Sequence, residues 1–120
     1  MKTIITICLL TLHLVTGKSF DKTSVYINED GKTYEFVAVY PARDQNALVS
    51  YMDKSLDVST SLKNTVTDAE LTLDNKYTFY MKQRPGELKL KFDKRKNTPQ
   101  AYQKLKQMCE GLKDLINHKS

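Results

Sequence analysis

The sequence predicts an α+β fold in which an antiparallel sheet of about five strands carries two helices on one face. Three patterns lead to this prediction. Apolar and polar residues alternate along short segments between residues 24 and 93, as they do in strands with one buried face. Turn residues separate these segments, and two longer segments repeat their apolar residues at helical spacing. The predicted order is two strands, a helix, three strands and a final helix that lies across the sheet.

The first seventeen residues have the pattern of a secretory signal peptide. Lys2 precedes a mostly apolar run over residues 4–15, and Val15 and Gly17 place modest or small side chains before the expected cleavage site. The run is shorter than the roughly 20 apolar residues that span a bilayer. We expect cleavage after Gly17, with cleavage after Ser19 as the alternative. Residues 18–120 then form one α+β domain that is secreted or periplasmic, without a transmembrane segment.

Turn residues predict how the strands pair. Asp30-Gly31 is typical of a two-residue hairpin turn, which places Ile27 opposite Tyr34. In the last hairpin, a two-residue Pro85-Gly86 loop would set two lysines opposite each other, which is unfavourable. We therefore prefer a four-residue loop over residues 83–86, which sets Lys82 opposite Glu87 and Tyr80 opposite Lys89. The predicted strands are residues 24–28, 32–40, 65–73, 76–82 and 87–93.

The second predicted helix has clearer end signals than the first. Asp44 is the expected N-cap of the first helix, which ends near Leu56. Thr98 and Pro99 fit the N-cap and the first position of the second helix. Residues 57–64 fit either an edge strand or a loop. The expected core consists of Phe36, Leu71, Phe79, Leu88, Leu90 and Phe92 from the sheet and of Leu48, Met52, Leu105, Met108, Cys109 and Leu112 from the helices.

Few residues are available for metal binding or nucleophilic catalysis. Outside the signal segment the chain has one cysteine and one histidine, Cys109 and His118, whereas a zinc site needs about three or four ligands. Cys109 lies on the apolar stripe of its helix and is interpreted as a core residue, with a reactive or intermolecular thiol as the alternative. Asp68 and Glu70 fit a solvated sheet face better than a catalytic pair. We expect no catalytic residues, no metal and no cofactor.

The charge of the chain is unevenly distributed. Residues 18–81 carry 7 basic and 10 acidic residues, a net charge of −3, whereas residues 82–120 carry 11 and 4, a net charge of +7. Lysines with an interleaved aromatic ring can bind a polyanion, although lysines on an outer face also keep natural sheets soluble. The candidate binding residues lie on and just after the last hairpin and are Tyr80, Lys82, Lys89, Lys91, Lys94, Arg95 and Lys96.

These observations favour a non-catalytic binding or interaction domain that is secreted or periplasmic. The basic residues suggest an anionic partner, for which an anionic glycan, lipopolysaccharide and an acidic protein are the candidates. Nucleic acid is not expected as the partner of a secreted chain. Two alternatives stay open. One is a small carrier that holds an apolar ligand between the sheet and the last helix. The other is an enzyme that uses only carboxylates or tyrosines.

Overall fold

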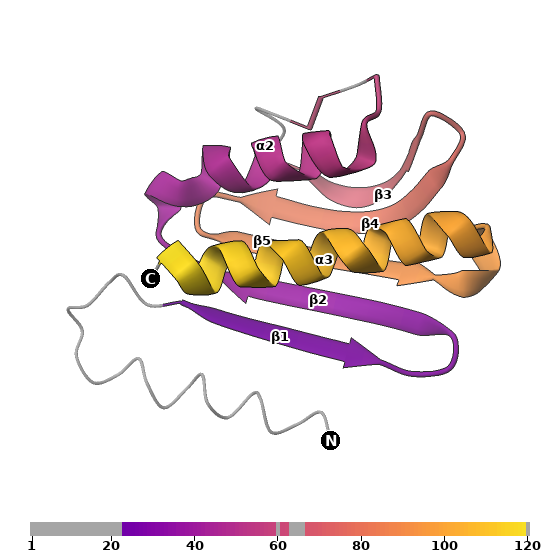
Figure 1. Cartoon of the computed structure of the whole chain (residues 1–120), viewed down its shortest axis with the longest axis horizontal. Helices are drawn as coiled ribbons and strands as arrows, with labels where there is room; N and C mark the ends of the chain where they lie inside the picture. Colours follow the sequence, from indigo (N-terminus) through magenta and orange to yellow (C-terminus); the bar gives the residue numbers. More distant parts are fainter. Residues whose placement is uncertain (1–22, 60, 63–66, 120) are drawn as a thin grey trace.

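Two strands that are far apart in the sequence, β2 (Thr33–Val39) and β5 (Glu87–Asp93), pair at the centre of the sheet. β1 (Ser24–Glu29) forms a hairpin with β2, and β3 (Thr67–Leu73) and β4 (Tyr77–Arg84) lead into β5 as a meander. The resulting antiparallel sheet has the order β1-β2-β5-β4-β3 (Figure 1). The computed structural model describes residues 23–59, 61–62 and 67–119, and the predicted signal peptide lies outside them.

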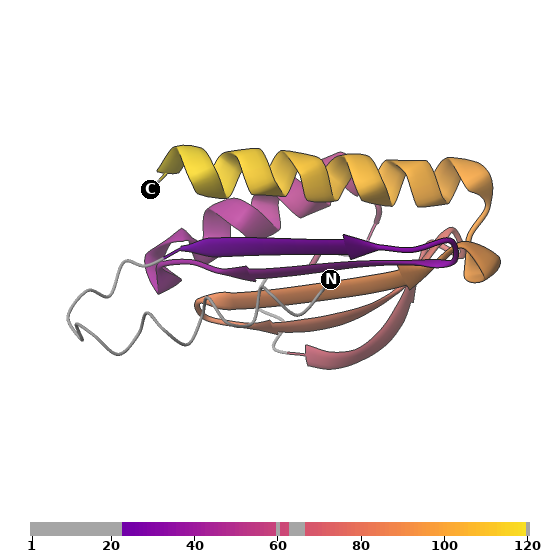
Figure 2. The same ribbon diagram turned by 90° about the horizontal axis from the view of Figure 1, so that it is seen from below.

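Both helices cover the same face of the sheet, which confirms the predicted α+β fold (Figure 2). α2 (Gln45–Leu56) lies over the side of the sheet that contains β3 and β4, and α3 (Pro99–Lys119) lies over its centre (Figure 1). Two short 3-10 turns, η1 (Ala42–Asp44) and η2 (Lys94–Lys96), precede the helices. The other face carries no helix in the described part of the chain and is called the outer face below.

The core lies between the covered face and the two helices. The predicted core residues are buried except Leu71, which is half-buried because β3 is an edge strand. Gln83 was expected in a loop, yet it is a core residue with only 2% of its surface exposed. Its amide is satisfied there, since Oε1 accepts from Gln45 Nε2 at 3.0 Å and Nε2 donates to the Leu62 carbonyl at 3.4 Å. This polar link ties α2 to β4.

The predicted register of the first hairpin is wrong by two residues. Ile27 lies opposite Phe36 rather than Tyr34, and Glu29 lies opposite Tyr34. The cause is the side chain of Asp30, which accepts hydrogen bonds from the amides of residues 32 and 33 at 2.7 and 2.8 Å. These bonds form the turn around Gly31-Lys32 instead of Asp30-Gly31. A shift of two residues keeps every side chain on its predicted face.

The preferred register of the last hairpin is also wrong. Arg84 lies opposite Glu87 and Lys82 opposite Lys89, so the loop is the two-residue Pro85-Gly86. Gly86 has φ of +87°, and proline followed by such a glycine suits a type II turn, which outweighs the unfavourable pairing of the two lysines. The Arg84 Nε donates to the Glu87 carboxylate at 3.0 Å, and this ion pair favours the shorter loop.

One further expectation needs correction, and the structure decides between two alternatives that the sequence left open. Asp44 stands at the N-cap of α2, but its side chain makes no capping hydrogen bond, because η1 already leads into the helix. In the segment 57–64, residues 57–59 and 61–62 form a loop and not an edge strand, while the other residues lie outside the described part. Asp53 holds this loop by accepting from the Leu62 amide at 2.8 Å and the Ser61 hydroxyl at 2.6 Å.

The two helices approach each other closely at Gly111 of α3. A Cβ atom at this position would overlap the hydroxyl and ring of Tyr51 on α2. A glycine inside a helix costs about 1 kcal/mol relative to alanine, so its presence here is explained by the packing of the Tyr51 ring.

We expect Gly111→Ala to lower the free energy of unfolding by about 1–3 kcal/mol, because overpacking exceeds the gain in helix propensity. Urea unfolding followed by circular dichroism measures the effect. In a Tyr51→Ala background, the same substitution should raise the stability instead. Equal effects of Gly111→Ala in both backgrounds would contradict the role of the Tyr51 ring.

Candidate functional site

Four of the predicted binding residues lie together on the outer face. Tyr80 is paired with Lys91 and Lys82 with Lys89 across β4 and β5. The alternation of buried and accessible residues along both strands keeps these four side chains away from the core. The predicted clustering of lysines around an aromatic residue is therefore present in the fold.

Carboxylates are interleaved with these lysines. Glu35 on β2 lies 3.4 Å from the ammonium group of Lys89, and Asp68 on β3 accepts a hydrogen bond from the Tyr80 hydroxyl. The register also places Glu35 opposite Lys91. Strand pairing thus brings acidic residues from β2 and β3 to both sides of the basic hairpin. The outer face carries mixed charge, which weakens its attraction for a polyanion.

The side chains of the three basic residues of η2 contact three different parts of the molecule. Arg95 pairs with Asp93 at 2.7 Å, and this pairing holds the pKa of Asp93 well below its usual value. Lys96 pairs with Glu70 on β3 at 2.8 Å. The ammonium group of Lys94 instead lies 5.5 Å from the centre of the Tyr102 ring on α3. Lys82 lines one pocket together with Asp68, whereas Lys94 lines a different pocket at the start of α3.

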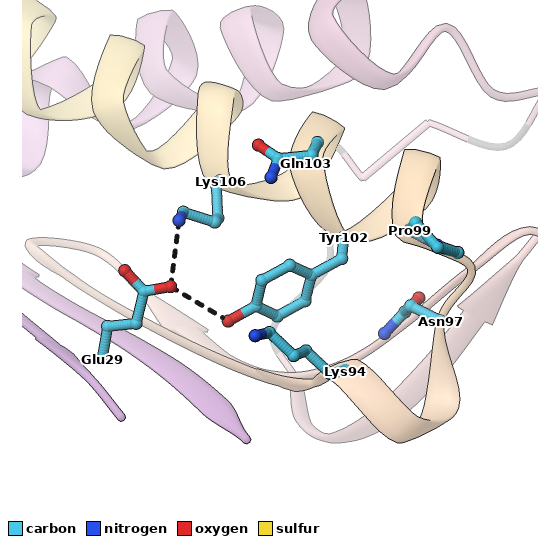
Figure 3. A pocket seen from close by; sticks show the side chains of 7 residues that line it. All are labelled: Glu29, Lys94, Asn97, Pro99, Tyr102, Gln103 and Lys106. Atoms are coloured by element: carbon cyan, nitrogen blue, oxygen red, sulfur yellow. Dashed lines mark hydrogen bonds and ion pairs between the residues drawn. The ribbon is translucent and has the colours of Figure 1, made fainter. Parts of the chain in front are cut away.

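This pocket, called the end pocket, lies between the end of β1, η2 and the first turns of α3 (Figure 3). Its volume is about 470 Å³. The Glu29 carboxylate accepts from Lys106 Nζ at 2.9 Å and from the Tyr102 hydroxyl at 3.3 Å. The Lys106 ammonium group also lies 5.8 Å from the centre of the Tyr102 ring. The lining residues are Glu29, Lys94, Asn97, Pro99, Tyr102, Gln103 and Lys106.

Asn97 fixes the shape of the end pocket. Its Nδ2 donates to the carbonyls of Thr78 and Asp93 at 2.9 and 3.0 Å, and its Oδ1 accepts from the Thr78 amide at 2.9 Å. The next residue, Thr98, caps α3 as predicted, because its Oγ1 accepts from the Ala101 amide at 3.1 Å. The amide of Asn97 is thereby used within the fold, and we assign it a positioning role.

Stacked aromatic rings support the floor of the end pocket. Tyr34 stacks on Phe92 at 5.0 Å between ring centres, and the rings of Phe92 and Tyr102 form a T-shaped contact at 5.4 Å. Burial, together with the nearby charge of Glu29, raises the pKa of Tyr102 to about 12. Burial raises the pKa of Tyr34 as well, and its hydroxyl is buried without a hydrogen-bond partner among the described residues. Both tyrosines are therefore neutral near pH 7.

The polar groups that a ligand can reach in the end pocket are two ammonium groups, one amide and one carboxylate. Lys94 and Gln103 are exposed, and Lys106 has donors left beyond its bond to Glu29. Lys94 and Lys106 carry two positive charges against the single carboxylate of Glu29, at the positive end of the α3 dipole. The arrangement can bind an anionic group that also carries hydrogen-bonding substituents.

The other side chains that could take part in catalysis are buried, far apart or already bonded to a neighbouring side chain. Cys109 is fully buried, and burial raises the pKa of its thiol. His118 lies nine residues further along α3, a rise of about 13 Å, and its Nδ1 is 2.8 Å from the Asp114 carbonyl. Glu70 is paired with Lys96, and the bond to Asp68 raises the pKa of Tyr80. No group of His, Cys, Asp and Glu within the described residues could hold a metal ion.

The space between the sheet and α3 is filled by side chains. Leu90, Phe36 and Leu105 are fully buried there, and Met108 is 1% exposed. The two pockets beside the first turns of α3 lie at the surface and are lined mostly by polar residues, together with Pro99 and, in the end pocket, the ring of Tyr102. This packing gives no support to a carrier with an apolar ligand at the centre of that layer.

Comparisons of the chain with protein-family models, with curated proteins and with solved structures found no match. Among the residues that the structure describes, no helix is long and apolar enough to cross a membrane. The geometry and chemistry of the end pocket are therefore the basis for a function.

Replacing Asn97 tests the frame of the end pocket. Asn97→Asp removes both donors to the Thr78 and Asp93 carbonyls, and we expect it to lower the free energy of unfolding by about 1–3 kcal/mol. Gln107→Glu makes the same chemical change on the exposed side of α3 and should alter stability by less than about 0.5 kcal/mol. Urea unfolding compares the two variants, and equal midpoints would contradict the positioning role.

Alkaline pH should destabilise the protein through its buried tyrosines. The folded chain keeps the proton of Tyr102 up to a pKa of about 12, whereas an unfolded tyrosine releases it near about pH 10. The free energy of unfolding is therefore largest below about pH 10 and falls as the pH rises toward 12.

Tyr102→Phe should make this alkaline decline shallower, because the group that titrates is removed. Urea midpoints measured at a series of alkaline pH values give the slope for the parent and the variant. An unchanged slope would show that other groups account for the loss.

Proposed function

We propose that this protein is a non-catalytic binding domain that acts outside the cytoplasm and binds an anionic glycan in the end pocket. The observation that carries the proposal is the convergence of two ammonium groups on one pocket. Lys94 comes from η2 and Lys106 from α3, and both lie within 6 Å of the Tyr102 ring centre. The pocket of about 470 Å³ is large enough for a small ligand or a sugar unit.

The mixture of polar groups favours a glycan over a simple polyanion. Sulfate or carboxylate groups can pair with the two ammonium groups. Sugar hydroxyls can donate to the free oxygen of Glu29 and bond with the amide of Gln103, both of which line the pocket. An acidic protein segment offers fewer hydroxyl donors than a glycan to the Glu29 carboxylate, which can only accept hydrogen bonds.

The net positive charge of the last third of the chain contributes long-range attraction in this proposal. Residues 82–120 carry a net charge of +7, and exposed Lys91 belongs to this excess. Summed charge accelerates the approach of an anionic partner even where individual lysines are paired with carboxylates. Export is supported by the positively charged start, apolar run and small residue of the first seventeen residues.

A matched pair of variants tests the proposal. Lys94→Gln removes one positive charge in the end pocket, and Lys91→Gln removes one on the outer face, so both have the same net charge. The full chain is expressed with its own N-terminal segment, purified in its processed form, and its N-terminus is determined by mass spectrometry. Titration calorimetry with sulfated and uronic-acid oligosaccharides, at low and physiological salt, then measures affinity.

We expect Lys94→Gln to weaken binding about tenfold, the effect of losing about 1.4 kcal/mol, and Lys91→Gln to change it less than about twofold. Equal losses in the two variants would show that binding follows net charge and would contradict a site in the end pocket. Absence of binding by the parent to every anionic oligosaccharide would overturn the proposed ligand class. A chain recovered without processing would contradict export.

A further inference from the structure

β1 is an edge strand whose free backbone groups can be identified. The Asp30 amide donates to the Thr33 carbonyl at 3.0 Å, and the Tyr40 amide donates to the Gly86 carbonyl at 3.1 Å. Hydrogen-bonded pairs alternate along antiparallel strands, so both bonds lead to the same assignment. Residues 24, 26 and 28 direct their backbone groups toward β2. The amides and carbonyls of Val25, Ile27 and Glu29 point away from the sheet.

Within the described residues, this edge lacks the features by which edge strands usually avoid pairing. Residues 24–28 include no charged residue and no proline, and the register with β2 is continuous without a bulge. Val25 and Ile27 are only partly buried against the core. The opposite edge strand, β3, differs because it carries Asp68 and Glu70. Of the two edges of the sheet, β1 is the one suited to accept another strand.

We propose that β1 pairs with β1 of a second copy, so that the protein forms a two-fold symmetric dimer with a continuous sheet. The pairing is antiparallel and centred on Tyr26, which faces Tyr26 of the second copy on the outer face. Val25 then faces Ile27 of the second copy on the covered face. The outward backbone groups of Val25 and Ile27 supply the hydrogen bonds.

The alternation of side chains selects this register. In an antiparallel pair, opposite residues lie on the same face, so only registers that match residues of like face are possible. Centring the pair on Tyr26 matches apolar Val25 with apolar Ile27, and aromatic pairs across strands are favourable. Centring it on Ile27 would instead place Val25 opposite Glu29, whose carboxylate is already held by Lys106 and Tyr102.

Self-complementarity also favours a second copy over a foreign strand. Pairing β1 with β1 closes after two chains because the same edge is used by both. Pairing β1 with β3 of another molecule would continue without closure, and Asp68 and Glu70 on β3 limit it. Pairing at this sheet edge is independent of glycan binding in the end pocket.

A charge introduced at Tyr26, on the two-fold axis, tests the dimer. Tyr26→Lys and Tyr26→Glu each place two like charges opposite each other, at an outer-face position where the monomer can keep its fold. Sedimentation of the processed full chain over a range of concentrations gives the dissociation constant, and circular dichroism checks folding. Thr72→Lys adds the same charge to the exposed face of β3 as a control.

We expect each Tyr26 variant to raise the dissociation constant at least tenfold, an equimolar mixture of the two to restore the dimer, and Thr72→Lys to leave it unchanged. A parent that stays monomeric at millimolar concentration would overturn the proposal, whether the edge is free or covered by the chain's own N-terminal residues or a different protein. A dimer that persists in both Tyr26 variants would overturn it as well.

A cysteine at the same position tests the register. Residues that face each other in a non-hydrogen-bonded pair have Cα atoms about 4.5 Å apart, which suits a disulfide. Tyr26→Cys should therefore form a covalent dimer under mild oxidation, while Cys109 stays buried. Failure of Tyr26→Cys to form this bond in a dimeric protein would contradict the register centred on Tyr26.

Discussion

The pairing of β2 with β5 is the interaction on which the rest of the structure depends. It joins a hairpin and a meander that α2 separates in the sequence, and it places Tyr34 directly opposite Phe92. The pairing extends past the strands, because the Lys94 amide donates to the Lys32 carbonyl at 2.9 Å. This bond sets the point at which η2 leaves the sheet, and Asn97 then fixes the start of α3. The end pocket is thus a consequence of where β5 meets β2.

The same pairing explains which parts of the fold could be predicted from the sequence. Strands, helices and core residues follow from local periodicity, and these predictions are confirmed for nearly the whole core. The order of the strands involves residues such as Phe36 and Leu90, which are far apart in the chain, so no local pattern contains it. Both register errors arose where a local contact outweighed a general turn rule. The carboxylate of Asp30 shifted one turn, and the Pro85-Gly86 pair formed a two-residue turn despite the opposed lysines.

In the candidate site, too, single residues could be found from the local sequence, whereas contacts between residues far apart in the chain could not. The basic residues could be found from the sequence, and Lys94 among them lines the end pocket. Glu29 could not be connected with Tyr102 and Lys106, because more than seventy residues separate it from either. One local signal was available, since Tyr102 and Lys106 are four residues apart on a helix and therefore share a face. The carboxylates of Glu35 and Asp68 on the outer face could not be placed beside the basic hairpin either, because this requires the order of the strands.

β1 connects the two surfaces to which we assign binding. Its last residue, Glu29, directs its carboxylate into the end pocket and its backbone groups toward the free edge. The side chain is held by Lys106 and Tyr102 irrespective of what pairs with the backbone, because side chains and outward backbone groups extend in different directions. A register centred on Tyr26 places Thr23 of the second copy opposite Glu29, at the rim of the pocket. The dimer and the ligand therefore use different atoms of one strand, so the fold can accommodate both at once.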